Sequence, residues 1–160
     1  MASGRTGSRA VARSLTGWYQ KNARDLPWRK TRNPYRIWIS EMMLQQTTVA
    51  TVIPYYKRWI KKFPTVKHLA AASLDDILKT WEGLGYYARA RNLYKAAQII
   101  VTDYKGRVPS DPETLLSLPG FGPYSTAAVS SIAFQKRLAV VDGNVERVVT
   151  PLCIFRRVSG

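Results

Sequence analysis

The sequence predicts an all-α protein. Apolar residues recur at helical spacing through most of the chain, and no alternation of apolar and polar residues persists long enough to build a sheet. Asn33-Pro34 and Asp111-Pro112 each combine a capping side chain with a proline in the first turn, which is typical of a helix start. The 160 residues are enough for one domain with one hydrophobic core.

The expected helices follow one another with short connections. Residues 25–28 form an extended link that leads into a basic stretch, and Gly83 and Gly85 separate two of the later helices. The short apolar run at 138–141 fits either a strand or a buried link. In order, the predicted helices span residues 11–21, 34–46, 49–61, 74–81, 86–104, 112–118, 123–133 and 142–152.

The composition favours a polyanionic partner. Lys and Arg number 25 against 10 Asp and Glu, which gives a formal charge of +15. A solvated basic surface is the plain interpretation, but nucleic acid is the expected partner of so large an imbalance. A membrane is disfavoured, because the basic residues are not gathered on one amphipathic helix and no apolar run reaches membrane-spanning length. The single cysteine, Cys153, predicts a reducing compartment.

The segment Leu118-Pro119-Gly120-Phe121-Gly122 joins two predicted helices. Two glycines separated by one residue permit a tight turn with positive φ, and the following helix N-terminus offers backbone N–H groups to an anion. A plain helix–helix turn is the alternative, since Gly-x-Gly alone is weak evidence. The flanking Leu-Pro and the small residues that follow favour a site for DNA phosphate, which binds without reading the bases.

Two carboxyl groups are candidates for acid–base chemistry. Glu41 shares a helical stripe with Ile37, Trp38 and Leu44, so its pKa should be raised, as suits a proton donor. From the pattern alone, a Glu that reaches water from the edge of the stripe is the better interpretation. Asp142 would ordinarily cap a helix. Its functional alternative is an ionised carboxylate at the rim of a cleft, and an acid with a charge stabiliser is what glycosidic cleavage requires.

Adjacent tyrosines follow the glycine-rich turn 83–85. An aromatic ring at a mobile tip can wedge into a base stack, and Arg89 in the following helix can hold phosphate. The alternative places Tyr86 on the surface and Tyr87 in the core, and we expect Tyr87 to be a core residue. The helix that carries Glu41 ends in amides and hydroxyls that could also meet bases.

Four stretches carry a family resemblance: residues 38–47, 83–93, 118–122 and 141–145. They closely resemble the MutY-type adenine DNA glycosylases, which belong to the helix-hairpin-helix glycosylase superfamily. The match runs from about residue 18 to residue 149, with the motifs in the family's order. The resemblance implies a helix-hairpin-helix DNA glycosylase fold, with a six-helix barrel and an incomplete second helical domain.

The family removes adenine mispaired with 8-oxoguanine or guanine in double-stranded DNA, with the adenine flipped out of the duplex. The resemblance implies that Glu41 protonates adenine N7, while Asp142 stabilises the oxocarbenium-like sugar or captures it transiently. It further implies an adenine pocket lined by Arg24, Leu26, Trp28 and Leu44, and DNA contacts from Gln46, Thr47, Tyr86, Arg89, Gly120 and Gly122.

Tyr124 separates two chemical subclasses within the resemblance. Relatives that cut the strand, such as endonuclease III, carry a Lys here to form a Schiff base, which a Tyr cannot do. We therefore expect a monofunctional glycosylase, with Tyr124 as a third catalytic residue near the sugar. Tyr also occurs here in thymine-mismatch glycosylases, but the stretches 44–47 and 85–87 look more like the adenine enzymes.

The sequence departs from the family pattern towards its C-terminus. The family continues with further helices, four cysteines that hold a [4Fe–4S] cluster, and a domain that recognises 8-oxoguanine. Cys153 does not match a cluster position, so we expect no metal or cofactor ligated within this chain. Residues 1–28 are expected to belong to the second, cluster-type helical domain, residues 29–138 to the six-helix barrel with the hairpin, and residues 139–160 to the truncated start of the second domain.

The sequence therefore predicts a monomeric, monofunctional adenine DNA glycosylase of base-excision repair, acting on double-stranded DNA at the nucleoid in the cytoplasm. Two alternatives stay open at this point. One is a non-catalytic helix-hairpin-helix fragment that binds DNA without releasing a base. The other is a thymine glycosylase that acts on G:T mismatches.

Overall fold

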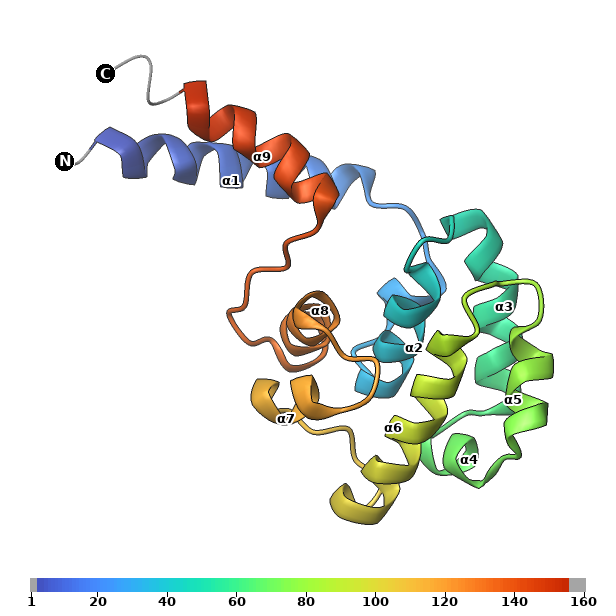
Figure 1. Cartoon of the computed structure of the whole chain (residues 1–160). Helices are drawn as coiled ribbons and strands as arrows, with labels where there is room; N and C mark the ends of the chain where they lie inside the picture. Colours follow the sequence, from blue (N-terminus) through green and yellow to red (C-terminus); the bar gives the residue numbers. More distant parts are fainter. Residues whose placement is uncertain (1–2, 156–160) are drawn as a thin grey trace.

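The computed structural model describes residues 3–155 and confirms the predicted all-α class (Figure 1). Within this range the regular structure is entirely helical, and no β-strand occurs. The elements are α1 Ser3–Asn22, the 3-10 helix η1 Pro27–Lys30, α2 Pro34–Leu44, α3 Val49–Lys62, α4 Val66–Ala71, α5 Leu74–Trp81, α6 Ala88–Tyr104, α7 Pro112–Ser117, α8 Pro123–Phe134 and α9 Gly143–Phe155.

Helices α2 to α8 form the body of the molecule around one apolar core. Helix α2 packs against α3, α6 and α8, and every side chain from Ile37 to Met43 is buried. The fully buried indoles of Trp38, Trp59 and Trp81 anchor the core, and the last two meet edge to face with ring centroids 5.4 Å apart. Helix α2 is therefore enclosed by its neighbours rather than exposed along one side.

Each helix predicted from the sequence is present. The ends differ by a few residues, except that α1 begins at Ser3, eight residues before its predicted start at Val11. The short helix α4 escapes sequence prediction because six residues are too few to display helical periodicity, although Thr65 caps it by accepting from His68 N–H. The predicted link at 25–28 is shorter in the structure, because Pro27 and Trp28 belong to η1. The apolar run 138–141 is an irregular link and not a strand, and it is not buried, since Leu138 is 40% and Val141 50% exposed.

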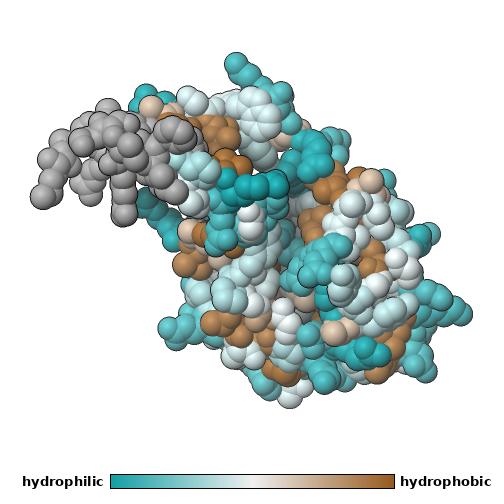
Figure 2. All heavy atoms as spheres, turned by 45° about the horizontal axis from the view of Figure 1, so that its top comes forward, coloured by the Kyte–Doolittle hydropathy of each residue, from teal (hydrophilic) through white to brown (hydrophobic). Residues whose placement is uncertain are grey.

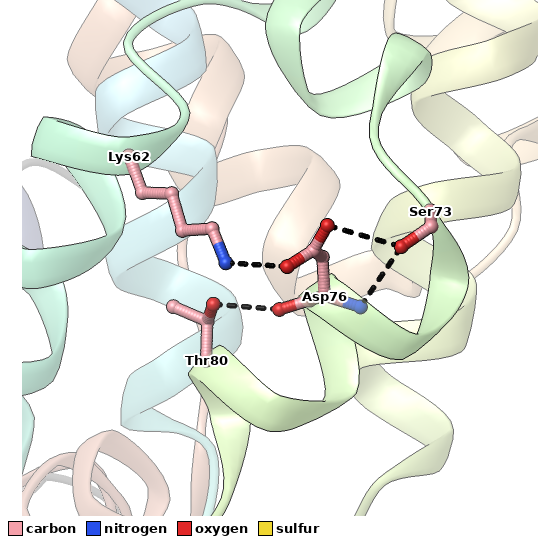
Figure 3. A network of polar contacts seen from close by, with 4 residues as sticks. All are labelled: Lys62, Ser73, Asp76 and Thr80. Carbon is pink, nitrogen blue, oxygen red and sulfur yellow. Dashed lines mark hydrogen bonds and ion pairs between the residues drawn. The ribbon is translucent and has the colours of Figure 1, made fainter.

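A polar clamp joins the end of α3 to the start of α5 (Figure 3). Lys62 Nζ lies 2.8 Å from Asp76 Oδ1, and the Ser73 hydroxyl donates to Asp76 Oδ2 while accepting from Asp76 N–H, both at 3.1 Å. The contact with Lys62 lowers the pKa of Asp76. Because both charged groups are largely exposed, the clamp fixes the cap geometry and adds little stability.

Helices α1 and α9 lie outside this body (Figure 1). Figure 2 shows hydrophobic residues at the surface among hydrophilic ones. This arrangement is compatible with the predicted domain boundaries after residues 28 and 138, which stay predictions. The large apolar side chains exposed on these two helices are Val11, Leu15, Trp18 and Tyr19 of α1, and Val145, Val148 and Val149 of α9.

Among residues 3–155, no helix combines the length and apolar character needed to cross a membrane.

Candidate active site

Helix α2 carries Glu41 into the interior of the molecule. Asn33 caps the helix by accepting Arg36 N–H at 3.1 Å, and Pro34 occupies the first turn as predicted. The Glu41 side chain is only 8% exposed. The alternative of a solvated Glu at the edge of the stripe is therefore wrong, since neighbouring helices cover this side of α2.

Burial raises the pKa of Glu41 above its ordinary value of 4.5, because a carboxylate without water loses hydration energy. Hydrogen bonding by the Tyr124 hydroxyl partly offsets this effect. The direction confirms the pKa shift predicted from the apolar stripe. A raised pKa increases the protonated fraction at neutral pH, as a proton donor requires.

Tyr124 comes from the first turn of α8, which packs on α2. Burial raises the pKa of Tyr124 to about 12, and the negative charges of Glu41 and Asp142 act in the same direction. The phenol therefore stays protonated across the working pH range. Its hydroxyl is a hydrogen-bond donor towards Glu41, and it is close enough to both carboxyl groups for their charges to act on it.

Asp142 caps α9, as its plain interpretation predicts, by accepting Val145 N–H at 2.8 Å. Asn144 Nδ2 lies 3.2 Å from the second carboxylate oxygen. These hydrogen bonds, that from Val145 N–H first, lower the pKa of Asp142, which lies at the surface. Capping and charge are compatible roles here, since the same carboxylate is ionised and also borders the cavity that contains Glu41.

One cavity of about 450 Å³ brings the three predicted catalytic residues together. Two side chains with shifted pKa values in opposite directions face the same space, Glu41 raised and Asp142 lowered. Such a pair assigns one group as acid and the other as anion. The cavity is lined by Glu41, Leu44, Gln45, Gln46, Tyr124, Asp142 and Asn144.

A second cavity of about 400 Å³ adjoins the first, and both are bordered by Glu41, Leu44 and Tyr124. Its walls are apolar where Leu26 and Trp28 are buried, with guanidinium groups from Arg24 and Arg29 among its lining. A largely apolar cavity with a few polar groups suits a heteroaromatic base. The structure thus brings together all four residues predicted for the base pocket: Arg24, Leu26, Trp28 and Leu44.

Some residues that line these cavities were not predicted from the sequence. Asn144 follows Asp142 by two positions within the stretch 141–145. The geometry of the helix cap therefore predicts that it lies close to the Asp142 carboxylate. Tyr19 and Ile132 border the second cavity from α1 and α8. No local signal marks them, because only the folded chain places these helices beside η1.

The predicted hairpin lies between α7 and α8 and is fixed to the core by Phe121, whose ring stacks on Trp38 with centroids 5.3 Å apart. Gly120 has a φ of 82°, as the turn chemistry predicted. A Cβ at this position would lie 2.8 Å from the Cβ of Asn92 in α6. Gly122 N–H is already bonded to the Ser125 hydroxyl at 2.9 Å, so it is not freely available to phosphate.

We expect Gly120→Ala to lower the free energy of unfolding by about 2 kcal/mol, through positive φ and contact with Asn92. Gly122→Ala is the matched control, since Gly122 has a φ of −107° and open space around it. Urea unfolding of both variants measures the difference. Equal stability of the two variants would contradict the account of the hairpin.

The tips of two loops carry residues predicted to meet DNA. Gln46 follows α2 with a φ of 56°, and Tyr86 precedes α6 with a φ of 48° and a side chain that is 61% exposed. Thr47 lies beside Gln46. The prediction that Tyr87 is a core residue is wrong: its ring is 37% exposed, because it belongs to the turn before α6.

The burial of Arg89 argues against the phosphate contact predicted from its position. The residue is 7% exposed, and its guanidinium donates to backbone carbonyls at the C-terminus of α2 and in the turn before α6. Burial lowers the pKa of Arg89 below its ordinary value, although an Arg remains charged at neutral pH. The sequence signal, an Arg after an aromatic tip, does not distinguish a ligand of DNA from a ligand of the chain's own backbone.

We predict that Glu41→Gln stabilises the protein at neutral pH. The folded state raises the pKa of Glu41, so the wild type loses stability as pH rises through that value, while a Gln does not. Below the ordinary value of 4.5 the carboxyl is neutral in both states, and the difference should disappear. Thermal unfolding as a function of pH measures this, with exposed Glu113→Gln as control. A difference that persists at low pH would contradict the assignment.

Residues 39–158 match the family model of the HhH-GPD superfamily base excision DNA repair protein. The chain therefore belongs to this superfamily. Within it, the chain is similar to proteins named adenine DNA glycosylase: that of Rattus norvegicus is 49% identical over 94% of this chain and 30% of its own length. The chain spans between 26% and 48% of the length of such curated relatives.

Solved structures agree with the helix-hairpin-helix glycosylase fold. A thermostable thymine-DNA glycosylase is 35% identical, with a TM-score of 0.84 over 93% of this chain and 69% of that one. A non-covalent complex of endonuclease III with DNA is 29% identical, with a TM-score of 0.77 over 89% of this chain and 66% of that one. The family and fold predicted from the sequence are thereby confirmed.

The residues of this chain do not fit the iron–sulfur cluster that the resembled family contains. Such a cluster takes four cysteine ligands, and the sequence contains one cysteine. Within the described part of the chain, no three His, Cys, Asp or Glu side chains gather as a metal site would require.

Proposed function

We propose that this chain is the base-excising part of an adenine DNA glycosylase of base-excision repair. It hydrolyses the N-glycosidic bond of adenine mispaired with 8-oxoguanine or guanine. The observation that carries the proposal is the cavity in which a buried Glu41 of raised pKa and a surface Asp142 of lowered pKa face one space. The similarity to proteins named adenine DNA glycosylase supports adenine as the base.

Glu41 donates its proton to N7 of the flipped adenine. The C1′–N9 bond then breaks, and its electron pair stays with the base, which leaves as neutral adenine. Nearby DNA phosphates add negative potential and raise the pKa of Glu41 further. The second cavity, which Glu41 also borders, has apolar walls at Leu26 and Trp28, as a purine needs.

Asp142 stabilises the positive charge that develops on the sugar as the bond breaks. Its cap hydrogen bonds hold the carboxylate in place and ionised before the substrate arrives. Water adds to C1′ and loses a proton, which leaves an abasic site. Tyr124 has no amine for a Schiff base, so the chain releases the base without cutting the strand.

The partner in this proposal is double-stranded DNA that carries a mispaired adenine. The positive charge of the chain, the hairpin at Gly120 and the exposed tips at Gln46 and Tyr86 are the features that support this contact. The proposal also includes action as a monomer, location with the DNA inside the cell, and the division of the chain after residues 28 and 138.

The proposal predicts abasic sites when the 160-residue chain is incubated with an adenine:8-oxoguanine duplex. Strand breaks should appear only after alkali treatment, which gel electrophoresis of labelled DNA resolves. A G:T duplex is the parallel substrate, because the similarity to a thymine-DNA glycosylase makes thymine removal the second candidate. Preferential release of thymine would replace adenine as the base, and strand cleavage without alkali would contradict the role given to Tyr124.

A further inference from the structure

Arg89 lies in the first turn of α6 and contacts two loops, both of which contact DNA in the proposed function. One loop is 45–47, which follows α2, and the other is 83–87, which precedes α6. Each loop contains a non-glycine residue of positive φ, Gln46 and Tyr86. A positive φ is uncommon for such residues and persists only where surrounding contacts impose it.

The guanidinium of Arg89 supplies contacts to both loops. Nη1 donates to the carbonyls of Met42 at 2.9 Å and Met43 at 3.1 Å, and also to that of Gln45. The last carbonyls of a helix have no partner within it, so this nitrogen caps the C-terminus of α2. The cap therefore fixes the point at which the chain leaves α2 for Gln46.

The second nitrogen of the same guanidinium reaches the other loop. Nη2 donates to the carbonyls of Leu84 at 3.1 Å and Gly85 at 3.3 Å, and to the Thr47 hydroxyl at 3.4 Å. Trp81 Nε1 donates to the Gly85 carbonyl as well, at 2.9 Å. A single planar side chain thus spans the gap between the two loops, with donors on either side.

Aromatic rings enclose the guanidinium. Its carbon lies 5.3 Å from the centroid of the Trp81 ring and 5.3 Å from that of Tyr86. The Tyr86 ring therefore contacts the Arg89 guanidinium while most of its surface stays exposed to solvent. No carboxylate lies among the hydrogen-bond acceptors recorded for Arg89, which are backbone carbonyls and one hydroxyl.

We propose that Arg89 is a positioning residue that holds Gln46 and Tyr86 at a fixed spacing for insertion into the base stack, and is not a phosphate ligand. The inference rests on the proposed function, in which both loops meet DNA. Lys cannot replace Arg here, because an ammonium is a point charge without the planar fork that reaches both loops. Positive charge at residue 89 is then not sufficient.

The test measures duplex binding and base unstacking separately. Binding of Arg89→Met, Arg89→Lys and wild type to one duplex is followed against salt concentration, and 2-aminopurine at the mispaired position reports unstacking by its fluorescence. The control is Arg91→Met, which removes the same charge from an exposed position in α6. Thermal melting establishes that each variant folds.

We expect Arg89→Met and Arg89→Lys to lower the unstacking equilibrium about tenfold, as suits the loss of several hydrogen bonds. The slope of log affinity against log salt should stay as in wild type, because no phosphate contact is lost. Arg91→Met should keep wild-type unstacking. If Arg89→Met reduced the slope by about 0.9 with unstacking intact, Arg89 would be a phosphate ligand and the inference would be overturned.

Arg89→Lys keeps the test decisive if the Met variant does not fold. Wild-type unstacking by the Lys variant would overturn the inference, since charge alone would then suffice. Base release by wild type is recorded in parallel on a matched duplex that carries adenine at the mispaired position. An inert wild type that still unstacks the base would count against the proposed function and leave the role of Arg89 supported.

Discussion

Asp142→Asn should slow single-turnover base release by about 10²–10³-fold, because the substitution removes the anion that faces the developing sugar cation. The fold should survive, since Asn caps a helix as well as Asp does and can still accept Val145 N–H. Duplex binding should not weaken, as a negative charge is removed near phosphate. Chemical quench of base release under excess enzyme measures the rate.

Asp111→Asn is the matched control for this variant. Asp111 caps α7 by accepting Thr114 N–H at 2.9 Å, and it lies at the surface and does not border either cavity at Glu41. It should release adenine at the wild-type rate. If the two Asn variants slowed base release to the same small extent, Asp142 would act only as a helix cap.

Glu41→Gln should reduce base release by about 10²–10⁴-fold, the range for loss of a general acid. A Gln side chain occupies nearly the same space and can accept a hydrogen bond from Tyr124, so the cavity should keep its shape. Duplex affinity should stay at the wild-type level or rise, because no positive charge is removed. Single-turnover release and fluorescence anisotropy measure the two quantities.

The control for charge alone is Glu113→Gln, a change at an exposed position of α7. It should leave base release unchanged. Glu41→Gln is also the variant expected to be more stable than wild type at neutral pH, so loss of activity would not reflect loss of fold. Wild-type activity in Glu41→Gln would remove Glu41 from the chemistry.

The helices and the hairpin were accessible from the sequence because their signals are local. Asn33 and Pro34 mark the start of α2, and the glycines at 120 and 122 mark the turn before α8. Such features depend on residues a few positions apart, so sequence spacing is enough to predict them. The raised pKa of Glu41 is different: its apolar neighbours on the helix stripe suggested it, but the same pattern favoured a Glu that reaches water, and burial by neighbouring helices decides between the two.

Features that depend on contacts between distant residues were not accessible in the same way. Arg89 looks like a surface cation in sequence, but its acceptors at Met42, Met43 and Gln45 lie more than forty positions away. The exposure of Tyr87 follows from the turn before α6 and not from its own type. Residue type and spacing do not indicate either, because the first is set by the packing of α6 against α2 and the second by the turn before α6.

The roles of the two acids needed the folded chain for a different reason. Asp142 is a good helix cap and Glu41 a possible edge residue when each is considered alone. In the structure both acids border one cavity, together with Tyr124, whose hydroxyl is affected by the charges of both. Opposite pKa shifts in one cavity distinguish an acid and an anion that act together from two unrelated carboxyl groups.

The most direct test of the central claim, that buried Glu41 is the proton donor, is the pH dependence of single-turnover adenine release by the 160-residue chain. The account predicts release at neutral pH that falls as pH rises through the pKa of Glu41, which lies above 4.5. Glu41→Gln should lack this decline. Release by wild type that equals that of Glu41→Gln at every pH, while both bind the duplex, would contradict the claim.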